Sequence, residues 1–122
     1  MRLAAVTEPF QWQLVRADFD PVEGSEQAGV RPALIVSRES VNKVLPIVSV
    51  IPLTTRKSNR RSFPNETSIA AGEGGLPNES MALAFQIRAI SKTRLLGSYG
   101  TVTDEATREN VREALRIHLD LD

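Results

Sequence analysis

Arg31 is the side chain whose neighbours in the sequence best suit it to bind a phosphate. It follows the polar loop GSEQAGV at 24–30 and precedes Pro32. A proline biases the residue before it towards an extended conformation, so we expect Arg31 at the entrance of a strand with its guanidinium free. A guanidinium stays charged and offers paired donors that match a phosphate. The alternative is a loop salt bridge with Glu26 or Asp18, which composition alone favours.

A second group of polar residues follows the apolar, β-branched segment at 46–53. Thr54 and Thr55 come directly after that segment, and a threonine hydroxyl there can donate to a phosphate oxygen, although threonine is also common in turns. The next loop carries no acid before Glu66, which favours a segment that follows a phosphate backbone over a merely solvated loop. Asn59 and Phe63 add an amide and a ring that could contact an unstacked base. The cations of this loop are Arg56, Lys57, Arg60 and Arg61.

Polar side chains also alternate with apolar ones near residue 86. Gln86 and Arg88 alternate with Phe85 and Ile87, so a strand would carry both polar side chains on one face. That face is either a polar site or exposed to solvent, because a buried Gln or Arg needs partners. His118, the single histidine, is interpreted as a packed or interface residue rather than as a catalyst.

The composition excludes several classes of protein. The chain has 122 residues, with 15 basic and 15 acidic side chains, no Cys and one His. We therefore expect no disulfide, no metal site and no cofactor, and any basic surface must be local. The motifs of serine hydrolases, phosphate-binding loops and zinc proteases are absent. No apolar run reaches the length of a membrane span, and residues 1–10 lack the apolar core of a secretory signal, so we expect a cytoplasmic protein.

Short strands are predicted over most of the chain. Pro52 indicates an edge, a bulge or the end of a strand. A fourth strand could lie at 66–70, and a flexible turn at 72–75. Apolar or alternating runs predict the other strands at 12–19, 33–36, 46–53, 81–90 and 95–102.

The C-terminal segment differs in its periodicity. Thr103 or Asp104 is a suitable N-cap, and Asp104 and Glu105 favour the first turn of a helix. Strands followed by one helix predict a mainly β fold, a small, strongly bent sheet or barrel with a helix packed on it. We expect one domain over 1–122, in which residues 1–10 could be a flexible extension. The apolar stripe of the helix comprises Val111, Ala114, Leu115, His118 and Leu119.

Three segments of the chain resemble toxins of the MazF/PemK family. ADFDPVEGSEQAGVRPALIV at 17–36 is similar to their opening signature, VSVIPLTT at 48–55 to their second strand, and SMALAFQIRAISKTRL at 80–95 to their QIR segment. The resemblance runs from about Trp12 to the C-terminus. It implies an SH3-like β-barrel with a C-terminal helix, assembled as a homodimer, that cleaves single-stranded RNA. It also implies a cognate antitoxin whose acidic segment covers the RNA groove.

The resemblance implies that Arg31 and Thr54 act at the scissile phosphate. RNA supplies its own nucleophile, so we expect metal-independent attack by the 2′-OH, which leaves a 2′,3′-cyclic phosphate and a 5′-OH. The residues that we expect to bind RNA are Ser25, Gln27, Thr55, Arg56, Lys57, Asn59, Arg60, Gln86 and Arg88.

Two positions depart from the family pattern. Phe85 stands where several members have an acid that is offered as the general base, so Glu26 is the nearest candidate beside a solvent-assisted route. Trp12 stands where many members have Gly, which is expected only to add core packing. The alternative is a family member that acts by binding, either a CcdB-like gyrase poison or a protein that binds RNA or an antitoxin without cutting.

Overall fold

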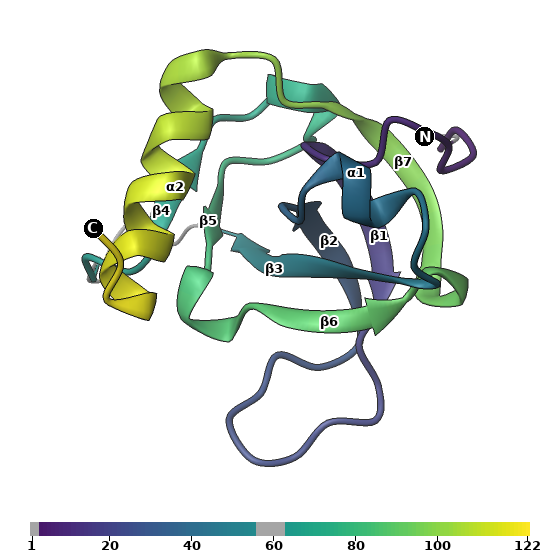
Figure 1. The fold of residues 1–122 in the computed structure, drawn as a ribbon, viewed down its shortest axis with the longest axis horizontal. Helices are drawn as coiled ribbons and strands as arrows, with labels where there is room; N and C mark the ends of the chain where they lie inside the picture. The colour runs from purple at the N-terminus through teal and green to yellow at the C-terminus, as the bar shows by residue number, and fades with distance from the viewer. Residues whose placement is uncertain (1–2, 56–62) are drawn as a thin grey trace.

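Short antiparallel strands and one long C-terminal helix build this protein (Figure 1). The computed structural model describes residues 3–55 and 63–122. The strands are β1 (Gln13–Asp18), β2 (Val30–Ile35), β3 (Ile47–Thr55), β4 (Thr67–Ile69), β5 (Ser80–Ala82), β6 (Arg88–Ser91) and β7 (Leu95–Thr101). The helices are α1 (Glu39–Asn42) and α2 (Glu105–Leu119), with the 3₁₀ turns η1 (Glu73–Gly75), η2 (Ala84–Gln86) and η3 (Lys92–Arg94).

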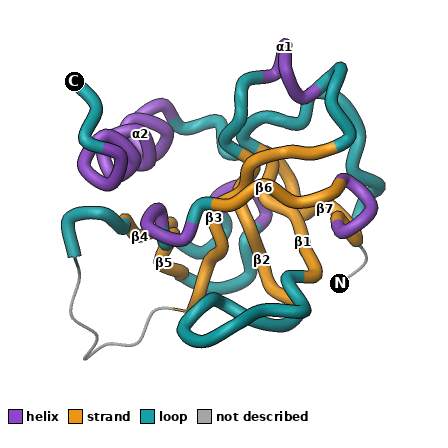
Figure 2. The backbone as a smooth tube through the Cα atoms, turned by 60° about the horizontal axis from the view of Figure 1, so that its bottom comes forward, coloured by secondary structure: helices purple, strands orange, loops and turns teal. Residues whose placement is uncertain are grey.

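The described strands form one bent antiparallel sheet with the order β4-β5-β3-β2-β1-β7, and β6 pairs with the first half of β3. This confirms the mainly β fold with a C-terminal helix. No ladder joins β6 to β7 in the part of the chain that the structure describes, so the described sheet does not close as the expected SH3-like barrel would. Figure 2 shows the strands curving round one another, with α2 beside β4 and β5.

Pro52 marks the point at which β3 changes its partner. β3 pairs with β6 over Ile47–Val50 and with β5 over Leu53–Thr55. The Pro52 carbonyl accepts a hydrogen bond from the Leu83 N–H at 3.0 Å, so Pro52 faces this side of β3, where it has no N–H to continue the ladder. The single strand predicted at 81–90 is therefore wrong, because η2 separates β5 from β6.

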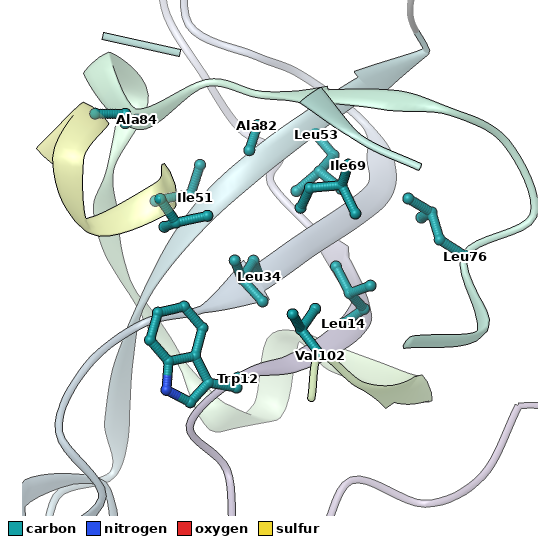
Figure 3. Close-up of a cluster of buried hydrophobic side chains, with 12 residues drawn as sticks. Trp12, Leu14, Leu34, Ile51, Leu53, Ile69, Leu76, Ala82, Ala84 and Val102 are labelled. Atoms are coloured by element: carbon teal, nitrogen blue, oxygen red, sulfur yellow. The ribbon is translucent and has the colours of Figure 1, made fainter. Parts of the chain in front are cut away.

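Two apolar clusters cover opposite faces of β1–β3. Successive side chains of a strand point to opposite faces, so Leu34 belongs to one cluster while Ala33 and Ile35 belong to the other. Figure 3 shows the first cluster, in which Trp12, just before β1, and Leu14 of β1 lie near Leu34 of β2. Burial of both faces explains why β2 and β3 carry nearly continuous apolar runs.

The helix α2 packs on the first cluster through Val111 and Ala114. Of the two predicted N-caps, Thr103 and Asp104, the structure has Asp104, whose carboxylate accepts from the Ala106 N–H at 3.2 Å. The packed alternative predicted for His118 is wrong, because the last turn of α2 leaves both His118 and Leu119 exposed, while the interface alternative stays a prediction. The buried stripe of α2 is therefore shorter than its apolar pattern predicts.

The residues before β1 lie against the sheet. Ala4 forms a β-bridge with Ser98 of β7, and Val6 and Phe10 pack against the second cluster. These contacts bring the first described residues beside β7 (Figure 1).

Glu39, the first residue of α1, holds the segment before β1 through its carboxylate. Its Oε1 accepts hydrogen bonds from the Phe10 N–H at 2.9 Å, the Gln11 N–H at 2.8 Å and the Asn42 amide at 3.3 Å. Burial by itself raises the pKa of this carboxyl. The backbone hydrogen bonds from Gln11 and Phe10, with smaller contributions from Asn42 and Lys43, lower the pKa by more than burial raises it, so the pKa of Glu39 lies below its ordinary value. A lowered folded-state pKa means that ionised Glu39 stabilises the fold above its ordinary pKa of 4.5.

We expect Glu39→Gln to lower the free energy of unfolding by about 1–2 kcal/mol at pH 7, because hydrogen bonds to a charged acceptor are replaced by weaker ones. The stabilisation is lost as pH falls through the lowered folded-state pKa, so the difference from wild type should shrink below pH 4.5. Urea unfolding at pH 7 and at acidic pH measures both values. The control Glu8→Gln changes an exposed carboxylate and should shift stability by less than about 0.5 kcal/mol. A Glu39→Gln difference that is the same at both pH values would contradict the role of the charge.

Candidate functional site

Arg31 and Thr54 come together because β2 and β3 are paired. Ala33 lies opposite Pro52 at the end of this ladder, and Arg31 and Thr54 each lie two residues beyond that pair, so alternation gives them its face. Both side chains line a hollow of about 310 Å³, which we call the first hollow. Its other lining residues are Val30, Pro32, Leu53, Thr55 and Ser80.

The Arg31 guanidinium is held by backbone carbonyls. Its Nε donates to the Ala28 carbonyl at 2.8 Å, and Nη1 makes a long contact of 3.5 Å with the Leu53 carbonyl. The salt bridge with Glu26 or Asp18 does not form: the Glu26 Oε1 accepts from the Glu23 N–H at 2.6 Å, and the Asp18 Oδ1 from the Asp20 N–H at 3.0 Å. Arg31 thus carries a positive charge that no described carboxylate neutralises by an ion pair.

A second hollow of about 420 Å³ lies under the loop between β1 and β2. Pro52 lines it while the next residue, Leu53, lines the first hollow, so β3 contributes a wall to each hollow. The predicted residues Ser25, Glu26, Gln27, Gln86 and Arg88 all line the second hollow, together with Phe19, Phe85 and Ile87.

Gln86 connects this loop to the rest of the protein. The Gln27 N–H donates to the Gln86 Oε1 at 2.8 Å, and the Gln86 amide donates to the Ser25 carbonyl at 3.3 Å. Both polar groups of Gln86 are therefore engaged with the loop. This contact holds residues 25–27 at the rim of the hollow and gives Gln86 a positioning role that the sequence did not predict.

Arg88 is held against Phe19 at the start of the loop. Its guanidinium carbon lies 5.6 Å from the centre of the Phe19 ring, a cation–π distance, and Nη1 makes a 3.4 Å contact with the Phe19 carbonyl. The prediction that Gln86 and Arg88 share one strand face is wrong, because Gln86 ends η2 and Arg88 begins β6. They nevertheless line the same hollow.

The base of the loop depends on residues that sequence reasoning missed. The Asp20 Oδ1 accepts from the Gly29 N–H at 3.0 Å, and the Phe19 N–H donates to the Gly29 carbonyl at 3.0 Å. Arg94 of η3 also donates to the carbonyls of Asp18 and Asp20. The available signal was the pair of aspartates that flanks Phe19, since short acidic side chains commonly hydrogen-bond nearby backbone N–H groups in turns.

Phe85 and Glu26 are the two residues of the second hollow that bear on proton transfer. The Phe85 side chain is half-buried there and supplies no acid or base, whereas Glu26 is exposed and supplies the carboxylate among the described lining residues. The described residues contain no cluster of three or more His, Asp or Glu side chains that could hold a metal ion.

The predicted RNA-binding residues at the end of β3 and after it divide between described and undescribed parts of the chain. Thr55 is exposed at the rim of the first hollow. Arg56, Lys57, Asn59 and Arg60 lie outside the described residues. Ser80 was not predicted; it is buried in β5 beside Thr55, and its hydroxyl donates to the Asn78 carbonyl at 3.0 Å.

The chain is similar to known proteins over most of its length. Residues 10–119 match the family described as "PemK-like, MazF-like toxin of type II toxin-antitoxin system". The chain is 36% identical over 105 residues to the endoribonuclease MazF of Staphylococcus saprophyticus subsp. saprophyticus, which covers 86% of either chain.

Two solved structures share the fold and some of the sequence. MazF from Deinococcus radiodurans superposes with a TM-score of 0.77 at 27% identity, covering 93% of this chain and 97% of its own. An endoribonuclease from a mycobacterial species, in complex with its cognate antitoxin, gives a TM-score of 0.74 at 28% identity with the same coverage. In the described residues, no helix is both long and apolar enough to cross a membrane.

Proposed function

This chain belongs to the family of PemK-like, MazF-like toxins of type II toxin–antitoxin systems, and from that membership we propose that it is an endoribonuclease that cleaves single-stranded RNA at the first hollow. The observation that carries the proposal is the juxtaposition of Arg31 and Thr54 at one hollow, with the Arg31 charge unpaired in the described structure. An unpaired guanidinium beside a hydroxyl suits a phosphate that gains negative charge during reaction.

The reaction follows from the chemistry of RNA. The 2′-oxygen attacks the neighbouring phosphorus while a base takes its proton, and the bond from phosphorus to the 5′-oxygen then breaks. Arg31 stabilises the charge of the phosphorane and can protonate the departing 5′-oxygen, while Thr54 donates to a non-bridging oxygen. The products are a 2′,3′-cyclic phosphate and a 5′-OH, and neither role requires a metal ion.

We assign the proton-accepting role to Glu26. Its Oε1 is engaged by the Glu23 N–H, and its Oε2 forms no hydrogen bond within the described structure. Because Glu26 lines the second hollow and Arg31 the first, an RNA segment that occupies both would meet a base on one side and a phosphate-binding group on the other. Ser25 and Gln27, held by Gln86, would contact that segment at the rim, with Arg88 below it. Thr55 and the cations Arg56, Lys57 and Arg60, with Asn59, would extend the contact.

We further propose that the chain acts in the cytoplasm as a homodimer that an antitoxin neutralises. The mycobacterial relative in complex with its cognate antitoxin supports an antitoxin partner, and an acidic segment would suit the unpaired Arg31. The exposed apolar side chains of Val41, Val44, Leu45 and Ile47 support a dimer, because a second copy would remove them from water.

Cleavage without metal is the experiment that tests this function. We expect the purified protein to cut single-stranded RNA in the presence of EDTA and to leave 5′-OH ends that polynucleotide kinase labels without prior phosphatase treatment. Sequencing of the labelled ends would give the cleavage motif. Loss of all cleavage in EDTA with restoration by Mg²⁺ would contradict the proposed mechanism.

A member that binds without cutting is the second candidate, and Phe85 is the observation that favours it, since its ring replaces an acid. In that case the protein would bind RNA, an antitoxin or gyrase, and no condition would release RNA fragments. The EDTA experiment distinguishes the two, because only a nuclease produces new 5′-OH ends.

A further inference from the structure

The orientation of the Arg31 guanidinium depends on a single peptide group. The backbone of Arg31 is fixed by strand pairing, since it lies opposite Ala17 in the β1–β2 ladder. The side chain beyond it is long and rotatable, and its shorter hydrogen bond is the one from Nε to the Ala28 carbonyl, at 2.8 Å against 3.5 Å for the contact with the Leu53 carbonyl. The direction of the guanidinium therefore follows the direction in which the Ala28 carbonyl points.

The other end of the same peptide group is held by Asp20. The Ala28 carbonyl and the Gly29 N–H belong to one planar trans peptide, in which the two groups point in opposite directions. The Gly29 N–H donates to the Asp20 Oδ1 at 3.0 Å. The peptide thus bridges a carboxylate and a guanidinium. Hydrogen bonds with charged partners are the stronger ones, and bonds in such a chain polarise one another.

Asp20 is anchored while the peptide that it holds is not. The Asp20 N–H donates to the Asp18 Oδ1 at 3.0 Å, and its carbonyl accepts from the Arg94 Nη1, so Asp20 is held from the end of β1 and from η3. The φ of Gly29 is 78°, and a glycine adopts conformations on either side of zero with similar ease. The backbone at Gly29 therefore does not fix the orientation of this peptide by itself, and the hydrogen bond from Asp20 supplies the constraint.

We propose that Asp20 is a positioning residue for RNA cleavage, which acts through the peptide between Ala28 and Gly29 to aim Arg31 at the scissile phosphate. Asp20 lines neither the first nor the second hollow, so its effect on the reaction passes through Arg31. This inference rests on the proposed function, since it assumes that Arg31 acts at the phosphate.

Single-turnover cleavage of an RNA with the mapped motif is the first test. Asp20→Ala should slow cleavage roughly ten- to one-hundred-fold, because a displacement of about 1 Å in a positioned group can cost a hundredfold in rate. Affinity for the same RNA with a 2′-O-methyl group at the scissile nucleotide should stay close to that of wild type. Asp20→Asn keeps an acceptor oxygen and should recover most of the rate. The control Glu8→Ala removes another exposed acid that precedes a proline and should cleave as wild type does.

A double-mutant cycle separates positioning from a general structural effect. If Asp20 acts through Arg31, adding Asp20→Ala to Arg31→Ala should slow cleavage no further, because no guanidinium remains to be aimed. Losses that multiply in the double variant would overturn the proposal. If Asp20→Ala does not fold, Asp20→Glu takes its place in the cycle, since it displaces the carboxylate by one methylene at constant charge and should also slow cleavage.

A measurement without RNA tests the same contact when no cleavage is observed. In a proton–nitrogen correlation spectrum, the Arg31 Nε–H signal is identified by its absence in Arg31→Lys. Asp20→Ala should shift this signal and speed its hydrogen exchange with water, whereas Asp20→Asn should leave it near the wild-type position. An unchanged Arg31 signal in Asp20→Ala would overturn the positioning role. A wild-type protein that cuts no RNA would contradict the proposed function instead, and the spectrum would still show whether Asp20 orients Arg31.

Discussion

Arg31→Ala is expected to slow RNA cleavage by roughly a hundred- to a thousand-fold, the loss that follows removal of one preorganised donor to a developing negative charge. Arg31 lines the first hollow with Thr54, and its position is set by the carbonyls of Ala28 and Leu53. Because its charge stabilises the phosphorane more than the ground state, kcat should fall together with kcat/KM. Single-turnover cleavage of an RNA that carries the mapped motif measures this loss.

Matched variants separate the charge of Arg31 from its geometry. Arg31→Lys keeps the charge but loses the paired donors, so it should recover only part of the rate. Thr54→Val removes the hydroxyl at nearly constant volume and should slow cleavage, while Thr54→Ser should stay close to wild type. Arg31→Ala also leaves two carbonyls without their donor, so its thermal unfolding must be compared with that of wild type. Unchanged cleavage in both Arg31→Ala and Thr54→Val would exclude the first hollow as the active site.

Trp12→Ala is expected to lower the free energy of unfolding by about 3–5 kcal/mol, the usual cost of removing a buried aromatic side chain. Trp12 is only 7% exposed and lies in the first apolar cluster beneath α2 (Figure 3). The guanidinium carbons of Arg108 and Arg112 lie 5.3 and 5.2 Å from the ring centre, so the ring joins the helix to the sheet through cation–π contacts as well as apolar packing. The ring therefore does more than fill the core.

The backbone conformation of Trp12 allows a second comparison, between the stabilities of a glycine and an alanine variant. Its φ is 73°, in the left-handed region that favours glycine. The conformation is held on both sides, since the Trp12 N–H donates to the Ile35 carbonyl at 2.7 Å and its own carbonyl accepts from the Val102 N–H at 2.8 Å. A non-glycine residue in this region carries about 1–2 kcal/mol of strain. The backbone at position 12 therefore has a conformation that glycine would adopt without this strain.

Trp12→Gly should therefore be more stable than Trp12→Ala, by about 1 kcal/mol, although both lose the ring. Urea unfolding of the three proteins measures the order. Trp12 lines neither the first nor the second hollow, so both variants should cleave RNA at a near wild-type rate at a temperature where they are folded. An alanine variant more stable than the glycine variant would show that backbone strain does not set the order.

Some features of the candidate site could be predicted from the sequence and others could not. The extended setting of Arg31 before Pro32 was predictable, and β2 indeed includes Arg31. The partners of Arg31 were not, because the predicted partners were nearby acids, whereas the contacts are with the Ala28 carbonyl and the Leu53 carbonyl, 22 positions away. Likewise the polarity of Gln86 marked it for a site, but its hydrogen bond with Gln27 joins residues 59 positions apart.

The sequence by itself predicted strands at 12–19, 33–36 and 46–53, which the structure has at 13–18, 30–35 and 47–55. It also predicted an N-cap at Thr103 or Asp104, of which the structure has Asp104, and the packing of α2 through Val111 and Ala114. These features depend on alternation, helical periodicity and capping, all of which act over a few neighbouring residues. Only the tertiary structure decided the break of 81–90 into β5, η2 and β6, because the break arises from the missing N–H of Pro52 on a strand distant in sequence. It also set Arg31 and Thr54 at one hollow, since strand pairing, and not spacing along the chain, determines which side chains face each other.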